Sequence, residues 1–282
     1  MYCAGVTEMA GVTRQFLLVL GVALGVAPPF AVARAQGVNP AIAASETRVS
    51  LGVTASGYTY RESGGVDRES GVLPGFSAGV SRLGPALGMR DIYTGVVYDF
   101  AGGALGYQGY LQGGAGAPRP YDQSDSARFN HVEVQLGAAV PLGRAISVLP
   151  FVAIGYQSWS RNVGGGSGYG SFYHAVLAGV GAKLDYAASG RLVLSAAAEG
   201  LAVLGGGVSA PALGLSGGFG TSGEEEVRLG ADWRLDNVWH VFAGLEMRHF
   251  NYAGSKPSNG VYEPTSGTFA ARGEMGVTFG FR

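Results

Sequence analysis

The residues of this chain best suited to acid–base chemistry are its histidines and the acids near them. Glu133 follows His131 at a spacing of two, which in a strand puts both side chains on one face. A histidine and a carboxylate held together in this way can act as an acid–base pair. His174, His240 and His249 have no acid at that spacing. A hydrogen-bonded interior histidine is the commoner role for such a residue, and both interpretations of His131 stay open.

Many other charged residues alternate with apolar ones. Successive side chains of a strand point to opposite faces, so these charges are expected to share one face, away from the apolar side chains. The predicted interior charges are Arg48, Asp91, Asp99, Glu133, Arg161, Lys183, Asp185, Arg191, Glu199, Glu226, Arg228, Asp232, Arg234, Glu246, Arg248, Arg272 and Glu274. Arg248 is expected to meet Glu274 across a strand pair.

The elements that position these charges are segments with a period of two. The last is the most regular, with Phe269, Met275, Val277 and Phe279 on one face and Arg272 and Glu274 on the other. Such alternation predicts a strand. Ten predicted strands cover Arg48–Tyr60, Leu73–Ser81, Met89–Gln112, Arg128–Val140, Ile146–Arg161, Phe172–Tyr186, Arg191–Leu204, Glu224–Leu235, Trp239–Tyr252 and Thr268–Arg282.

The connections between these strands alternate in length. Short ones are Leu83–Gly88, Pro141–Ala145, Ala187–Gly190 and Asp236–Val238. Long ones are Arg61–Val72, Gly113–Ala127, Asn162–Ser171, Gly205–Gly223 and Ala253–Gly267. A soluble sandwich has no reason to sort its loops in this way, whereas a transmembrane barrel has tight periplasmic turns and longer external loops. The sequence therefore predicts an all-β fold, a closed antiparallel transmembrane β-barrel of about ten strands spanning residues 46–282.

Aromatic residues on the predicted outer face form two bands. Those near the short turns are Tyr186, Trp233, Trp239, Phe279 and Phe281. Those toward the long loops are Tyr98, Phe100, Tyr156 and Phe269. Aromatic girdles at both interfaces of a membrane are typical of such barrels.

The N-terminal region predicts export. Residues 1–35 have the charged start, short apolar stretch and small-x-small site of a signal peptide, with Met9 as an alternative start, and 36–45 is a flexible lead-in. The single cysteine, Cys3, lies in the signal peptide. A formal net charge of −1 argues against a nucleic-acid partner.

With these features the chain resembles the Gram-negative outer-membrane β-barrel proteins. The resemblance rests on the signal peptide, the loop alternation and the aromatic-rich last strand, GVTFGFR. It implies an outer-membrane location, contact with outer-membrane lipid and lipopolysaccharide, and recognition of the last strand by the barrel-assembly machinery. In that group the chain usually ends in an aromatic residue, whereas here Arg282 follows Phe281.

Three functions are compatible with this architecture. The favoured one is a non-enzymatic barrel, structural or contact-making through its external loops, with a lumen filled by paired charges and without a cofactor or metal. The alternatives are a narrow, porin-like diffusion channel and a loop-borne hydrolase. The omptin-type proteases use an Asp pair and an Asp-His pair, and the lipid A deacylases use His-x-Ser. Asp-x-Asp, Asp-x-His and His-x-Ser are all missing from this sequence. The external ligand is not indicated by any motif.

Overall fold

The computed structural model describes residues 37–86, 88–111, 119–257 and 262–281, so the predicted signal peptide lies outside the described residues. The elements are α2 (Pro40–Ser45), β1 (Arg48–Glu62), β2 (Arg68–Ala86), β3 (Met89–Leu111), β4 (Arg119–Ala138), β5 (Val140–Pro141), β6 (Ile146–Asn162), β7 (Gly170–Ala187), β8 (Leu192–Ala210), the 3₁₀ turn η1 (Pro211–Leu213), β9 (Leu215–Gly218), β10 (Gly223–Arg234), β11 (Trp239–Ala253) and β12 (Thr265–Gly280). No helix in the described ranges is long and apolar enough to cross a membrane.

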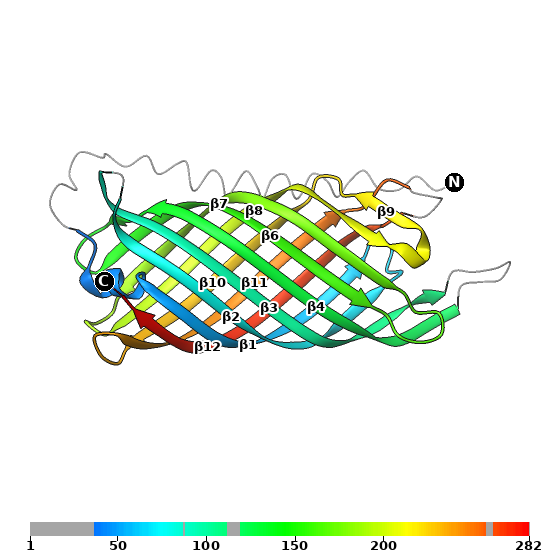
Figure 1. Cartoon of the computed structure of the whole chain (residues 1–282), viewed down its shortest axis with the longest axis horizontal. Coiled ribbons are helices and arrows are strands. Elements are labelled where there is room, and N and C mark those ends of the chain that lie inside the picture. The colour runs from blue at the N-terminus through cyan, green and yellow to red at the C-terminus, as the bar shows by residue number, and fades with distance from the viewer. Residues whose placement is uncertain (1–36, 87, 112–118, 258–261, 282) are drawn as a thin grey trace. The chain divides into compact units, whose positions relative to one another are not determined.

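Ten long strands close into one antiparallel barrel (Figure 1). The order around it is β1, β2, β3, β4, β6, β7, β8, β10, β11 and β12, so that each strand lies beside its neighbours in sequence. Closure comes from β1 and β12, in which residues 48–62 pair with residues 280–266. The short β5 and β9 pair only with β6 and β8. The predicted antiparallel barrel of about ten strands is confirmed.

At the external end the strands reach farther than predicted. Residues 68–72, 119–127 and 205–210 were expected in long loops but belong to β2, β4 and β8. In these extensions most outward side chains are polar or small, as where Gln108 of β3 faces Asp122 of β4, and the exposed Val72 stands at the lower end of the β2 extension. The alternation that marks the lower strands is therefore missing, although pairing continues because backbone N–H and C=O groups need partners.

The predicted flexible lead-in is wrong for residues 40–45, which form the helix α2. The side chain of Asn39 caps the helix by accepting a hydrogen bond from the Ala41 N–H at 2.8 Å, and Pro40 opens the first turn. Ile42 is completely buried and packs with Val193 of β8. Figure 1 shows α2 at the end of the barrel where β12 finishes. A capped turn with a buried apolar anchor is thus ordered.

The outer face of the barrel is a belt of exposed apolar side chains. Val53, Leu245 and Met275 are about two-thirds exposed. On β12, Phe269 and Phe279 both point outward near opposite ends of the belt. With about 3.3 Å per residue and a tilt of about 40°, they lie roughly 25 Å apart along the barrel axis, which is the height of a lipid-facing band.

Glycine allows large inward side chains to lie flat on neighbouring strands. The ring of Phe242, on β11, lies so close to Gly276 of β12 that a Cβ added there would be 2.7 Å from it. Phe151 of β6 covers Gly181 of β7 in the same way. These close approaches of ring to backbone require glycine, which explains part of the glycine content of the chain.

Candidate functional site

The middle of the lumen is crossed by three arginines, Arg228, Arg248 and Arg272, from the consecutive strands β10, β11 and β12. We define the central charged layer as these arginines and the carboxylates within ion-pair distance of them, which are Asp99, Glu133, Glu199, Glu224, Glu226, Glu246 and Glu274. Strand register creates its centre, because Glu246 lies directly opposite Arg228 on one side and Arg272 on the other. Cross-strand pairs on one face are close enough for such ion pairs.

Arg228 links neighbouring and opposite strands. Its Nη2 donates to Glu199 of β8 at 3.1 Å, and its Nε forms an ion pair with Glu226. The same Nη2 lies 3.9 Å from Oε1 of Glu133, on β4 across the lumen. One guanidinium group is therefore shared by carboxylates from both walls.

Arg248 pairs with a different acid than predicted. Its Nη2 lies 2.6 Å from Glu226 Oε2 and 3.2 Å from Glu246 Oε1. The expected pair with Glu274 is wrong, because the register sets Arg248 opposite Glu226 on β10 and opposite Ala270 on β12.

Glu274 belongs to Arg272 instead. Arg272 Nη2 lies 3.2 Å from Glu274, which also accepts a hydrogen bond from Ser77 Oγ at 3.1 Å. Arg272 Nη1 reaches Asp99 of β3 at 2.5 Å and its Nη2 pairs with Glu246. Arg272 thus also connects the two walls of the barrel.

The central charged layer is acidic rather than balanced. Seven carboxylates meet three guanidinium groups, so acids outnumber bases in this part of the lumen. His131 is buried among these acids, and its ring nitrogens lie 3.8 Å from Asp99 and 4.0 Å from Glu133. The distance between His131 and Glu133 exceeds a hydrogen bond, so these two side chains are not hydrogen-bonded to each other in this structure.

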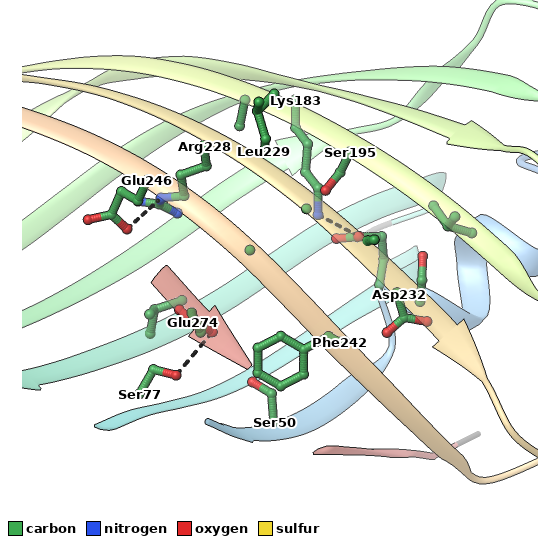
Figure 2. A pocket seen from close by; sticks show the side chains of 18 of the residues that line it. Ser50, Ser77, Lys183, Ser195, Arg228, Leu229, Asp232, Phe242, Glu246 and Glu274 are labelled. Atoms are coloured by element: carbon green, nitrogen blue, oxygen red, sulfur yellow. Dashed lines mark hydrogen bonds and ion pairs between the residues drawn. The ribbon is translucent and has the colours of Figure 1, made fainter. Parts of the chain in front are cut away.

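Between this layer and the periplasmic end lies a cavity of about 180 Å³, which we call the periplasmic chamber (Figure 2). Lys183 and Asp232 point into it, and Arg228, Glu246 and Glu274 lie at its other side. It has room for several water molecules. About half of the residues that line it are charged or carry a hydroxyl group, and most of the others are apolar, so the chamber has mixed polar and apolar walls.

Ion pairs connect the side chains at the periplasmic end of the periplasmic chamber. Lys183 Nζ lies 2.5 Å from Glu46, just after α2, and 3.8 Å from the buried Asp185. Burial opposes ionisation of Glu46, but Lys183 and Arg48 outweigh it and hold the pKa of Glu46 below its usual value. Arg48 Nη1 in turn bonds Asp232 at 2.8 Å. These contacts hold α2 against the barrel.

Toward the external end the lumen is filled by an aromatic layer. Its ring contacts run from Phe129 of β4 to Trp159 of β6, Tyr173 of β7, and Tyr252 and Phe250 of β11, and then back to Phe129. The separations between ring centroids along this circuit are 5.2–6.1 Å. All five rings are nearly inaccessible. This is a packed core across the whole barrel.

Arg161 is embedded in the same layer. Its guanidinium group lies over Tyr60, Trp159 and Tyr173, at 4.8, 5.1 and 5.7 Å from the ring centroids. It forms an ion pair with Glu69. Asp125 lies 3.8 Å from its Nε. Arg161 is only 2% exposed, so charge and aromatic rings are desolvated together.

Further acids surround this position from the connecting segments. Glu263, between β11 and β12, accepts hydrogen bonds from Tyr173 at 2.8 Å and Tyr60 at 3.3 Å. Burial raises the pKa of Glu263, and burial also raises the pKa of Asp67, between β1 and β2. The external end of the lumen is therefore acidic as well.

Three residues predicted for the lumen lie elsewhere. Arg191 is exposed in the turn before β8, because that strand begins one residue later than expected. Arg234 bonds the carbonyl of Gly190 at the periplasmic rim. Asp91 has a positive φ of 57°, which breaks the alternation next to the turn, and it takes part in none of the ion pairs found in the described ranges.

The sequence interpretation also missed several interior acids. Glu224 lies two residues before Glu226, so the alternation of the strand could have predicted that Glu224 also faces the lumen. Glu69, Asp125 and Glu263 came from segments predicted as loops, and Glu46 from the edge of the lead-in. For these the signal was weak, because no apolar outer face marks their segments as strands.

All of the predicted interface aromatics that lie within strands are on the outer face. Those exposed by about 40–50% are Tyr156, Tyr186, Trp233, Trp239, Phe269 and Phe279. Tyr98 and Phe100 are partly buried and contact the outward ring of Phe76, and Phe281 follows the end of β12. Trp239 and Phe279 meet edge to face at 5.5 Å. Their role as membrane anchors stays a prediction.

Comparisons with known proteins identify the fold only. No family model and no curated protein matches the sequence. Among solved structures, the chain is similar to the outer membrane protease OmpT from Escherichia coli, with 11% identity over 83% of this chain and 95% of that chain, and a TM-score of 0.50. Another match is the translocator domain of the autotransporter NalP from Neisseria meningitidis, with 13% identity over 98% of each chain and a TM-score of 0.44.

The fold and the outer face together give the location. At this level of identity the OmpT likeness shows the fold and not the activity. A closed barrel with an apolar belt roughly 25 Å high is suited to lipid and not to water. The chain therefore has the closed, ten-stranded fold of Gram-negative outer-membrane β-barrels, and its apolar belt suits an outer membrane.

Proposed function

We propose that this protein is a non-enzymatic outer-membrane barrel whose lumen is filled and whose external end makes surface contacts. The observation that carries the proposal is that side chains of opposite strands touch across the lumen. Phe129 of β4 and Phe250 of β11, five strands apart in either direction around the barrel, have ring centroids 5.5 Å apart. Such contact leaves no room for a solute at that height.

Polar bridges support the same proposal at other heights. Gln157 of β6 donates to Tyr252 of β11 at 2.9 Å, and Arg272 of β12 reaches Asp99 of β3. Removing one partner of a buried ion pair is costly, so the bridge between Arg272 and Asp99 resists displacement. Contact with lipopolysaccharide and insertion by the barrel-assembly machinery through β12 are part of the proposal.

Planar-bilayer conductance of the refolded protein tests the filled lumen. We expect no steady conductance from the parent, and stepwise conductance from the variant Phe129→Ala with Phe250→Ala, which removes the contact across the aromatic layer. The matched control is Phe269→Ala with Phe279→Ala, which truncates two rings on the lipid-facing side. A parent that conducts ions steadily would overturn the proposal.

The periplasmic chamber favours a second candidate, a narrow channel that is closed in this state. Its 180 Å³ would form the inner half of such a path, with the central charged layer as the constriction. In that case Arg248→Met would change ion selectivity while leaving the barrel stable. On the first proposal the same change destabilises the barrel without selective conductance.

A further inference from the structure

Two arginines lie side by side on the outer face of the barrel at its external end. Arg61 of β1 and Arg68 of β2 are directly opposed, and both are exposed. The next residue along this row is Gln108 of β3, opposite Arg68. The side chain of Arg61 points outward, because Arg61 lies an even number of residues after Val53 and Ala55 and therefore shares their exposed face of β1.

The placement of these arginines is unfavourable for the isolated barrel. Like charges directly opposite each other on one face of a sheet repel and destabilise it. The ion pairs of the described residues use other cations, and neither Arg61 nor Arg68 takes part in one. On this row the first outward acid is Asp122 of β4, beyond Gln108. The pair is therefore suited to an external anion.

The height of the row identifies the source of that anion. Phe269 of β12 marks the upper edge of the apolar belt, and the register sets it opposite Thr59 of β1. Arg61 is two residues farther along, about 5 Å higher at the tilt of these strands. Below Arg68 on the outer face of β2 is the exposed Val72. A charged head at Arg61 and a hydrocarbon chain beside Val72 would match a lipid.

We propose that Arg61, Arg68 and Gln108 bind a phosphate group of an outer-leaflet glycolipid. Two guanidinium groups bind a phosphate through paired, charge-assisted hydrogen bonds. The carboxamide of Gln108 adds a neutral donor beside them. The proposal rests on the lipopolysaccharide contact of the proposed function, but not on whether the lumen is filled, since it concerns the opposite face of the strands.

Native mass spectrometry and thermal unfolding test this site on the refolded full barrel. The probes are bisphosphorylated lipid A, dephosphorylated lipid A and inorganic phosphate, each in a neutral detergent. We expect retention of bisphosphorylated lipid A by the parent, and at least tenfold weaker retention by Arg61→Gln with Arg68→Gln. Arg82→Gln is the matched control, because Arg82 is an exposed arginine of the same strand near its periplasmic end. Heat-modifiable gel migration checks that each variant has folded.

The opposed charges allow a second measurement, the unfolding temperature, in which the effect of the substitution should reverse when lipid A is added. In neutral detergent alone, Arg61→Gln should unfold at a higher temperature than the parent, because the repulsion is removed. With bisphosphorylated lipid A the order should reverse. Equal retention by the parent and the double variant would overturn the proposal. So would stabilisation by inorganic phosphate equal to that by bisphosphorylated lipid A, which would indicate a free-anion site.

Discussion

Arg161 and Lys183 are both cations of the lumen, but their surroundings differ. Arg161 lies in the aromatic layer, 2% exposed and enclosed by rings and the buried carboxylates of Glu69 and Asp125. The side chain of Lys183 is 18% exposed and borders the periplasmic chamber. Water can replace a lost partner beside the chamber but not among packed rings. One end of the lumen is thus packed with aromatic rings, and the other holds ion pairs beside a cavity large enough for water.

The largest expected effect is at Arg161. Arg161→Met leaves Glu69 and Asp125 buried without their cation, which should lower the free energy of unfolding by about 3–5 kcal/mol. Lys183→Met should lower it by roughly 1–2 kcal/mol, because Glu46 and Asp185 can then contact water in the chamber. Urea unfolding of the refolded variants measures both changes. Equal costs would break the contrast between the two ends.

The central charged layer lies between these extremes, and its register can be tested directly. Arg248→Met should cost about 3 kcal/mol, because several acids lose a shared cation. Adding Glu226→Gln should recover part of that loss, since Glu226 lies 2.6 Å from Arg248. Adding Glu274→Gln should recover nothing, because Glu274 belongs to Arg272. Unfolding in urea gives the coupling energies, and recovery by Glu274→Gln alone would contradict the register.

Substituting one buried apolar residue in the barrel and one in α2 compares the stability of these two regions. Leu177 on β7 and Ile42 in α2 are both completely buried. Leu177→Ala should cost about 2–5 kcal/mol, because the packed core around it cannot close the cavity. Ile42→Ala should cost less than about 2 kcal/mol, since α2 can detach locally while the barrel stays folded. Hydrogen exchange should show faster exchange confined to α2 in the second variant.

The two-residue period of the sequence determines which parts of the fold and of the lumen could be predicted. It gives the face of each side chain, so the sequence placed Arg228, Arg248 and Arg272 in the lumen. It does not give register, so the partner of Arg248 was wrong although Glu226 was among the predicted interior acids.

Segments without a lipid-facing apolar side carried too little signal. The alternation that identifies a strand in the membrane comes from lipid on one side and the lumen on the other, and both sides are polar above the belt. Glu69 and Glu263 were missed for this reason. The short helix α2 was missed because six residues with one buried isoleucine resemble a linker.

The smallest expected effect is a dependence on pH at the external end. Burial raises the pKa of Glu263, which faces Arg161, the acids Glu62 and Asp67, and the hydroxyls of Tyr60 and Tyr173. A carboxyl whose pKa is higher in the folded state binds more protons there than in the unfolded chain. Its stabilisation is therefore complete below its ordinary pKa and is lost as the pH rises through the folded value. The protection factors of the amides of Tyr262, Glu263 and Thr265, which are corrected for the intrinsic rise of exchange with pH, should therefore fall as the pH rises above about 4. Glu263→Gln should flatten the profile, since the amide oxygen still accepts from the two tyrosines but cannot ionise, whereas Asp122→Asn on the outer face should leave it unchanged. A profile that keeps its slope in Glu263→Gln would assign the titration to Asp67 or Glu62 instead.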